Sequence, residues 1–159
     1  MIEAKLLTGS DNLIEVFDIR HRVFIDELQL PLIYKYDDFD NQAIHVIVYI
    51  KEQNILCPVA TGRIIYDGSI CEIDRVCVLK DYRRNKYGDF AVRMLLNKAF
   101  ISGINTVIVK APKDIEKFFK SIGFYEIQVE GYDLNNELKC LSIESNSIVK
   151  QCKNLSKNS

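Results

Sequence analysis

The stretch CEIDRVCVLKDYRRNKYGDFAVRML, residues 71–95, constrains the fold more than any other part of the chain. Its first half alternates apolar and polar residues, as strands do, and its second half has the broad apolar surface of a buried helix. Between the halves lies a basic turn, Arg83-Arg84-Asn85-Lys86, which Gly88 follows. The segment therefore predicts a strand that leads through a cationic turn into a helix.

Further elements are predicted on both sides of this segment. Apolar periodicity and turn residues predict strands over residues 2–7, 46–50, 59–66, 71–79, 106–111, about 124–133 and 138–145, and helices over about 12–28, 87–102 and about 113–122. Ser10 or Asp11 is the expected N-cap of the first helix, and Asn135-Asn136 the turn of the last hairpin. The predicted fold class is α+β, with a mixed, mostly antiparallel sheet of about seven strands and helices on both faces.

Composition limits the organisation and the partners. The 159 residues predict one domain over residues 1–146 and a frayed polar tail over 147–159. A net charge of −1 and the lack of a long apolar run or a leader sequence predict neither nucleic-acid nor membrane binding. Five cysteines without metal-ligand spacing predict free thiols, no metal site and a cytoplasmic location.

The basic turn has two physical interpretations. The first backbone N–H groups of a helix have no acceptor within it and carry the positive end of its dipole, so a cationic turn there can cradle a diphosphate. Gly88, which has no Cβ, would let the backbone approach that anion closely. The turn could instead be solvated surface balanced by Asp81 and Asp89. Spacing alone leaves both interpretations open.

Two motifs make the chain resemble the GCN5-related N-acetyltransferases, the GNAT superfamily. Residues 83–88, RRNKYG, are similar to the family's Q/R-x-x-G-x-G/A turn, with Lys86 in place of the central glycine. Residues 118–124, FFKSIGF, are similar to its FYxxxGF box, with Phe119 at the tyrosine position. The predicted order of elements matches the family fold from residue 2 to residue 145. The resemblance implies an acetyl-CoA-dependent N-acetyltransferase.

The resemblance also implies where acetyl-CoA, the acyl donor, would bind. Backbone N–H groups of the turn would hold the pyrophosphate, and the pantetheine arm would pair with the strand before it, where strands 71–79 and 106–111 splay apart. The implied cofactor-binding residues are Val76, Cys77, Val78, Arg83, Arg84, Asn85, Lys86, Tyr87, Gly88, Asp89 and Phe119. Because a Cβ disfavours positive φ, Lys86 argues against a left-handed backbone at its position.

The implied reaction is direct attack of a primary amine, of a small molecule or peptide, on the thioester. Glu72, eleven residues before Arg83, matches the catalytic glutamate of the histone-acetylating branch and is the expected base. Asp74, on the same face of the strand, is the second candidate catalytic carboxylate. Glu72 could instead form a structural ion pair with Arg20 or Arg63.

Protonation of the leaving thiolate is less clear, because Phe119 cannot donate a proton. The thiolate would leave unaided, or Tyr87, Tyr125, Tyr132 or Cys140 would supply the proton. A backbone N–H near Val78 would stabilise the oxyanion. The loss of the tyrosine also favours an alternative, a non-catalytic acyl-CoA-binding module.

A second resemblance covers residues 20–45, RHRVFIDELQLP…DDFDNQAIH, and points to ElaA-type acetyltransferases. It implies that Arg20, Asp37 and Asp40 line the acceptor site. Arg20 lies in the apolar stripe of its helix, where it either snorkels to solvent or points at a carboxylate inside a cleft. His45 is either a satisfied strand-edge histidine or a catalytic one.

The nature of the acceptor and the partners is predicted only in outline. Together the carboxylates of Asp37, Asp40, Glu72 and Asp74 favour a cationic amine. An acyl-homoserine-lactone-synthase-like acyltransferase is a further alternative, although Leu30 lies near the position of that family's tryptophan and argues against it. The GNAT resemblance also implies that the protein could form a homodimer.

Overall fold

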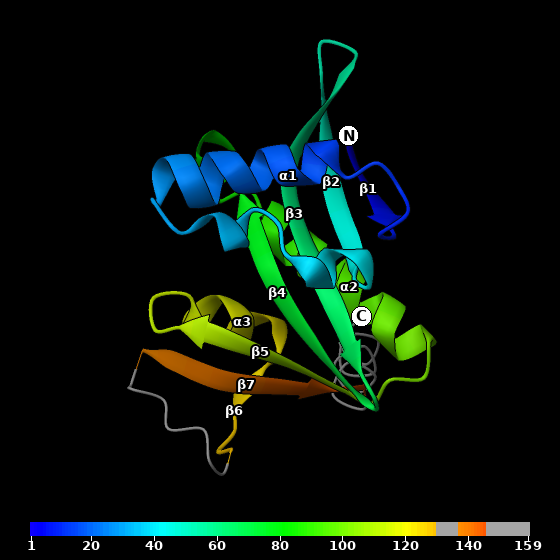
Figure 1. Cartoon of the computed structure of the whole chain (residues 1–159), viewed down its shortest axis with the longest axis vertical. Coiled ribbons are helices and arrows are strands. Elements are labelled where there is room, and N and C mark those ends of the chain that lie inside the picture. Colours follow the sequence, from blue (N-terminus) through cyan, green and yellow to red (C-terminus); the bar gives the residue numbers. More distant parts are fainter. Residues whose placement is uncertain (130–136, 146–159) are drawn as a thin grey trace, which may run out of the picture.

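A seven-stranded sheet runs through the part of the chain that the computed structural model describes, residues 1–129 and 137–145. Its strand order is β1-β2-β3-β4-β5-β7-β6 (Figure 1). The strands are β1 (Ile2–Leu7), β2 (Ile44–Glu52), β3 (Ile55–Asp67), β4 (Ile70–Val78), β5 (Thr106–Pro112), β6 (Tyr125–Glu126) and β7 (Leu138–Glu144). Neighbouring strands are antiparallel except β4 and β5, which are parallel. The predicted fold class is confirmed.

Helices cover both faces of the sheet. They are α1 (Ile14–Arg20), which continues as the π-helix η1 (His21–Glu27), α2 (Tyr87–Ile101) and α3 (Glu116–Ile122); short 3-10 turns lie at η2 (Leu32–Tyr34), η3 (Asp38–Asn41) and η4 (Lys80–Tyr82). One core packs α2 and α3 against the sheet, and a smaller core packs α1 and η1 on the opposite face. In Figure 1, α1 lies in front of β2, β3 and β4, and α2 lies behind them.

A bulge in β4 changes which residues face α1. Arg63 of β3 pairs with Asp74, but Thr61 pairs with Cys77, so β4 carries one extra residue here. Arg75 takes up the extra length with a left-handed φ of 53°. Because the bulge shifts the alternation of side chains, Asp74 before it and Cys77 after it both point toward the α1 face.

Strands β4 and β5 separate soon after they meet. Their pairing covers only residues 70–72 of β4 and 106–108 of β5. Beyond Glu72 and Ile108 the two strands diverge (Figure 1), and the facing edge of β4 has no strand partner within the described ranges. We call the opening between β4 after Glu72 and β5 after Ile108 the fork. It is the splay that the family resemblance implied.

Two predicted turns that depend only on neighbouring residues are confirmed. The hairpin at Asp67-Gly68 forms, with Gly68 at φ 64°. Helix α2 ends at Ile101, and Gly103 follows it with φ 89°. The predicted turn at Asn135-Asn136 and the tail 147–159 lie outside the described residues.

The predicted N-cap of the first helix is wrong. Helix α1 begins at Ile14, with Leu13 at the cap position. The carboxylate of Asp11 accepts the N–H of Thr8 at 2.7 Å in the preceding turn, and Ser10 also lies in that turn. The Asp11 carboxylate is therefore hydrogen-bonded in the turn before the helix and does not cap it. The second half of this helix is also a π-helix, in which Leu28 donates to the carbonyl of Val23 at 3.0 Å.

The predicted start of the third helix is also too early. The N–H of Ile115 donates to the carbonyl of Pro112 at 3.0 Å, so a turn precedes α3, which begins at Glu116. Helix α3 ends where predicted, at Gly123 with φ 125°.

Two features of the described residues concern cysteines and membranes. Cys57, Cys71, Cys77 and Cys140 are free thiols, and Cys152 lies outside the described ranges. Within those ranges, no helix combines the length and apolarity that crossing a bilayer requires.

We expect Gly9→Ala to destabilise the protein. A Cβ at Gly9 would lie 2.2 Å from the backbone oxygen of Asn41 in η3, and backbone cannot move aside as a flexible side chain would. The loss of unfolding free energy should exceed the ~1 kcal/mol of an average substitution. Ser10→Ala, at an exposed neighbour, should stay within about 0.5 kcal/mol. Urea unfolding measures both, and equal stabilities would contradict the close approach.

Candidate active site

A network of arginines and aspartates lies on the α1 side of the sheet, next to the fork. It gathers residues from several elements: Arg20 from α1, Asp37 and Asp40 from the η3 turn, His45 from β2, Arg63 from β3, and Asp74 and Arg75 from β4. The structure thus brings four residues that the sequence predicted as site residues into direct or shared contact: Arg20, Asp37, Asp40 and Asp74.

Arg63 is the centre of this network, and its side chain is 1% exposed. Its Nε and Nη2 donate to the two carboxylate oxygens of Asp74 at 2.7 and 2.9 Å, which is a bidentate pair. Its Nη1 donates to Asp40 at 2.9 Å, and its Nη2 also donates to Asp37 at 2.9 Å. One guanidinium therefore joins β3, β4 and the η3 turn.

Arg20 is fully buried, so the snorkelling interpretation is wrong. Its Nη1 donates to Asp40 at 2.8 Å and to the carbonyl of Lys35 at 3.1 Å. Its Nη2 lies 3.3 Å from Nδ1 of His45. Because a guanidinium can only donate, Nδ1 of His45 accepts, and Nε2–H donates to the carbonyl of Asp40 at 3.0 Å. His45 is thus satisfied within the network.

Burial and pairing set the charges of the network. Burial would raise the pKa of Asp40, but hydrogen bonding and the charge of Arg20 outweigh it and hold that pKa below its usual value. Burial also acts to raise the pKa of Asp37, and Arg63 outweighs it in the same way. Burial lowers the pKa of His45, against the hydrogen bond to the Asp40 carbonyl. The histidine is therefore neutral beside ionised carboxylates at pH 7.

Arg75, the bulge residue, ties β4 to the loop above it. Its guanidinium lies 4.6 Å from the ring centroid of Tyr34, a cation–π distance. It also contacts Asp37 at 3.3 Å and Asp74 at 3.4 Å. Arg75 was not among the predicted site residues, although a charged residue after Asp74 in an otherwise alternating strand marks the bulge.

Glu72 lies at the vertex of the fork, on the same face of β4 as Asp74. Its carboxylate pairs with Nζ of Lys110 at 3.5 Å, so the predicted structural pairing with Arg20 or Arg63 is wrong. The side chains of Glu72 and Lys110 are 31% and 34% exposed, which keeps both within reach of a ligand. Lys110, the lone charged residue in the apolar segment TVIVKA, was also not among the predicted site residues.

The turn between β4 and α2 has a left-handed backbone at two positions. Arg84 has φ 65° and Lys86, the residue before α2, has φ 64°. The expectation that Lys86 would avoid positive φ is therefore wrong. The first backbone hydrogen bond of helix α2, as described, runs from the N–H of Phe90 to the carbonyl of Lys86 at 2.9 Å. The N–H groups before Phe90 have no acceptor inside α2, as an anion cradle requires.

The side chain of Arg83 points away from this turn. Its Nη1 donates to Glu27 of η1 at 2.8 Å, and its Nε donates to the carbonyl of Val78 at 3.0 Å. Arg83 therefore connects the turn to the π-helix. Sequence reasoning had no signal for Glu27 as its partner, because the two residues lie far apart in the chain.

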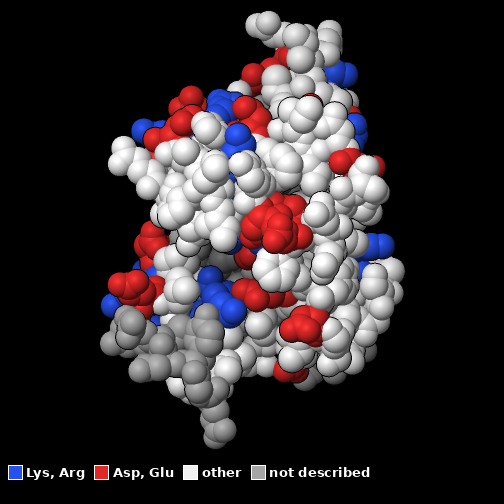
Figure 2. Space-filling model, viewed as in Figure 1, with Lys and Arg blue, Asp and Glu red and all other residues white. Residues whose placement is uncertain are grey.

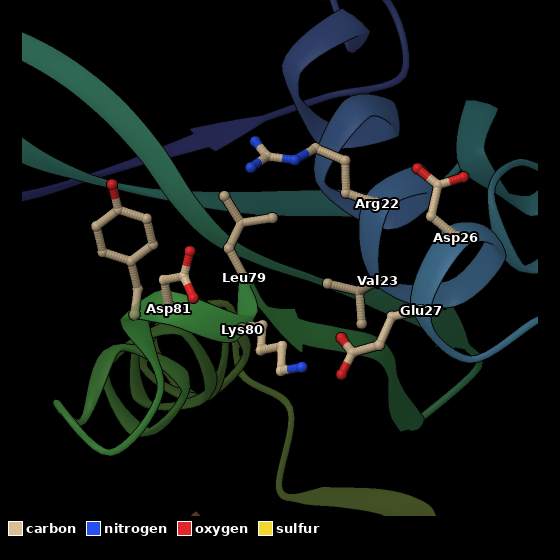
Figure 3. Close-up of a pocket in the computed structure, with 8 residues that line it drawn as sticks. Arg22, Val23, Asp26, Glu27, Leu79, Lys80 and Asp81 are labelled. Carbon is tan, nitrogen blue, oxygen red and sulfur yellow. The ribbon is translucent and has the colours of Figure 1, made fainter.

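A cavity of about 350 Å³ lies beside this ion pair (Figure 3). Residues of the π-helix form one wall, and residues that follow β4 form the other: Arg22, Val23, Asp26, Glu27, Leu79, Lys80, Asp81 and Tyr82. None of the predicted site residues lines this cavity. Figure 2 shows a hollow in the middle of the face seen in Figure 1, with acidic and basic side chains around it.

Two predicted cofactor residues have buried side chains. Burial raises the pKa of the Cys77 thiol to about 12, so only its backbone could serve a ligand at neutral pH. Phe119 is 5% exposed and packs against the rings of Phe118 and Phe124, at centroid distances of 5.0 and 5.4 Å. Their contacts with a cofactor stay predictions.

Comparisons with known proteins agree with this geometry. The model of the acetyltransferase (GNAT) family matches residues 13–128. YyaT of Bacillus subtilis (strain 168) is 32% identical over 84% of this chain and 84% of its own. The crystal structure of Escherichia coli ElaA has a TM-score of 0.70 at 24% identity, over 91% of this chain and 100% of that chain. PaiA N-acetyltransferase from Thermoplasma acidophilum, in complex with coenzyme A, has a TM-score of 0.64 at 11% identity, over 91% and 99%.

We expect the buried His45 to make stability fall below about pH 6.5, the pKa of a histidine in an unfolded chain. Because the folded pKa is lower, the unfolded chain takes up this proton first, and the free energy of unfolding decreases as the pH drops. His45→Gln cannot titrate and should flatten that slope, which is at most about 1.4 kcal/mol per pH unit. Urea unfolding of both proteins between pH 7 and pH 5 measures it. Equal slopes would refute the assignment.

Proposed function

The chain belongs to the acetyltransferase (GNAT) family, as its resemblance predicted, and on this premise we propose that it acetylates a primary amine with acetyl-CoA. The acceptor would be a small molecule or a peptide, and it would attack the thioester directly. The observation that carries the proposal is the fork: β4 loses its partner strand after Glu72 and leads straight into a turn whose N–H groups are open.

The fork and the turn would hold the two halves of the cofactor. The N–H groups of residues 84–89 would bind the pyrophosphate, helped by the exposed cationic side chains of Arg84 and Lys86. The unpaired edge of β4 at Val76–Val78 would pair with the pantetheine arm as an added strand would. The Val78 carbonyl now accepts from Arg83, and the arm would have to share or replace that bond. The coenzyme A complex of the structurally similar PaiA supports this use of the fold.

Glu72 would act as the base. It would take a proton from the acceptor ammonium, and the amine nitrogen would then attack the thioester carbonyl. As the C–S bond breaks, the nitrogen would lose its second proton to solvent and become the amide nitrogen. Asp74 has both oxygens in hydrogen bonds to Arg63, so it would orient the wall of the site and share the charge near Glu72. A backbone N–H near Val78 would stabilise the oxyanion.

Two of the four candidate proton donors for the leaving thiolate, Tyr125 and Cys140, are poorly placed to protonate it. The hydroxyl of Tyr125 is engaged with Glu144 at 2.6 Å, and this hydrogen bond raises its pKa. Cys140 is buried, and burial raises the pKa of its thiol; Tyr132 lies outside the described residues. A thiol-type group has a pKa near ~8.5 and leaves readily as the anion. A cytoplasmic location and a homodimer stay predictions.

Glu72→Gln should separate catalysis from binding. The amide keeps the size of the side chain but cannot take a proton, so kcat should fall by roughly 10²- to 10⁴-fold. The dissociation constant for coenzyme A should stay the same, because Glu72 lies outside the turn. The matched control is Glu126→Gln, at an exposed glutamate of β6, and it should keep wild-type kcat. Thiol release over an amine panel gives kcat, and an unchanged rate in Glu72→Gln would rule out Glu72 as the base.

Calorimetric titration tests the diphosphate cradle. Coenzyme A should bind on the order of 10²-fold more tightly than pantetheine, because charge-assisted hydrogen bonds contribute about 1.5–3 kcal/mol each. Lys86→Gly keeps the N–H groups and relieves the left-handed strain, so it should retain most of this difference. Similar affinities for the two ligands would contradict the cradle. Tight binding of coenzyme A without acetyl transfer to any amine would favour the non-catalytic acyl-CoA module instead.

A further inference from the structure

Strand β1 forms one edge of the sheet, at the end opposite the edge strand β6 (Figure 1). In the part of the chain that the structure describes, β1 pairs only with β2. An open edge is a template for another strand, and proteins usually keep such strands short or interrupt them with proline. Strand β6 has two residues, but β1 has six and contains no proline. Because Ile2 and Leu6 are also exposed, β1 has the length and the apolar surface to pair with a further strand.

The backbone groups of alternate β1 residues point out of this edge. The N–H of Lys51 in β2 donates to the carbonyl of Met1 at 3.3 Å. Hydrogen-bonded pairs alternate along an antiparallel ladder, so the odd-numbered residues of β1 bond to β2. The N–H and C=O groups of Ile2, Ala4 and Leu6 therefore point away from β2, where a partner strand could meet them.

The side chains of β1 place two opposite charges on one face of this edge. Ala4 packs against the core of α2, so the even-numbered side chains lie on the α2 face. Glu3 and Lys5 lie on the other face, where Nζ of Lys5 is 5.2 Å from the ring centroid of Tyr49 in the core of α1. The edge thus carries an acid and a base two residues apart, in a strand whose outward backbone groups are at Ile2, Ala4 and Leu6.

This pattern makes β1 complementary to itself in one register. Two copies related by a two-fold axis pair antiparallel, and because the outward groups belong to alternate residues, the axis must lie at a residue. The registers that use most of the strand have it at Glu3, Ala4 or Lys5. An axis at Glu3 sets two carboxylates opposite each other, and an axis at Lys5 sets two ammonium groups opposite each other; both are unfavourable.

Only the register centred on Ala4 pairs opposite charges. Glu3 of each copy then lies opposite Lys5 of the other, so the interface contains this ion pair twice. These are the positions of the ladder without direct hydrogen bonds, at which side chains approach most closely. On the α2 face, the exposed Ile2 of each copy lies opposite the exposed Leu6 of the other. Charge, hydrogen bonding and apolar contact therefore favour the same register.

We propose that β1 is a homodimer interface, in which the β1 strands of two copies pair antiparallel about Ala4 and join the two sheets. The partner is a second copy of this chain, and the contact is isologous, so the assembly closes at two copies. The inference goes beyond the proposed function and does not depend on it, since β2 and β3 separate β1 from the fork. One strand edge is a small interface, so the dimer dissociates in the micromolar range.

Charge reversal tests the interface and its register together. Glu3→Lys sets lysines opposite each other, and Lys5→Glu sets glutamates opposite each other, so each variant should dimerise at least about tenfold more weakly than the wild type. An equimolar mixture of the two variants restores opposite charges and should form heterodimers with nearly wild-type affinity. The double variant Glu3→Lys/Lys5→Glu should dimerise with itself. Sedimentation equilibrium gives each dissociation constant.

The matched control is Lys117→Glu, a charge reversal at an exposed lysine of α3, and it should keep the wild-type dissociation constant. Recovery of the dimer in the mixture also excludes misfolding as the reason for the loss in the single variants. A wild type that stays monomeric up to millimolar concentration would refute the proposal. So would a dimer that neither reversal weakens, which would use another surface, or single variants that fail to complement each other.

Discussion

The buried guanidinium of Arg63 is the interaction on which the site depends most. It holds β4 through Asp74 and the η3 turn through Asp37 and Asp40, while Arg20 attaches α1 to the same turn. Removing one partner of such a buried ion pair typically costs about 3–5 kcal/mol, because the remaining charge is left unpaired. The network therefore explains how an irregular loop is held against β3, β4 and α1 beside the fork.

The bulge at Arg75 and the early end of the β4–β5 pairing shape the part of β4 that lies next to this network. The bulge keeps Asp74 and Cys77 on the α1 side, and the fork leaves the edge of β4 open down to the turn before α2. An open strand edge is normally a liability, since its N–H and C=O groups seek partners. Here the edge faces the fork, and under the proposed function an extended cofactor arm would satisfy those groups.

Most of the charged side chains next to the fork are paired with a charge from another element. The acidic residues that suggested a cationic acceptor, Asp37, Asp40, Glu72 and Asp74, each contact an arginine or a lysine. Arg83 is paired in the same way, with Glu27 of the π-helix. The backbone N–H groups of the turn, which have no acceptor inside α2, remain available to an anion. Ion pairs between distant elements thus connect the turn before α2 and the network beside the fork to the helices of the α1 face.

The sequence by itself determined the features that depend on neighbouring residues. Alternation, helical periodicity and glycines gave the order of strands and helices, and the turn at residues 83–88 with the box at 118–124 gave the family. Tertiary structure decided which charged side chains pair with one another. Arg20 and Asp40 are 20 residues apart, and Arg83 and Glu27 are 56 residues apart, so no local pattern links them. The same holds for Glu72 and Lys110, which meet only because β4 and β5 are adjacent parallel strands. The left-handed backbone of Lys86 was likewise not predicted from the sequence, because a lysine side chain carries no local preference for positive φ.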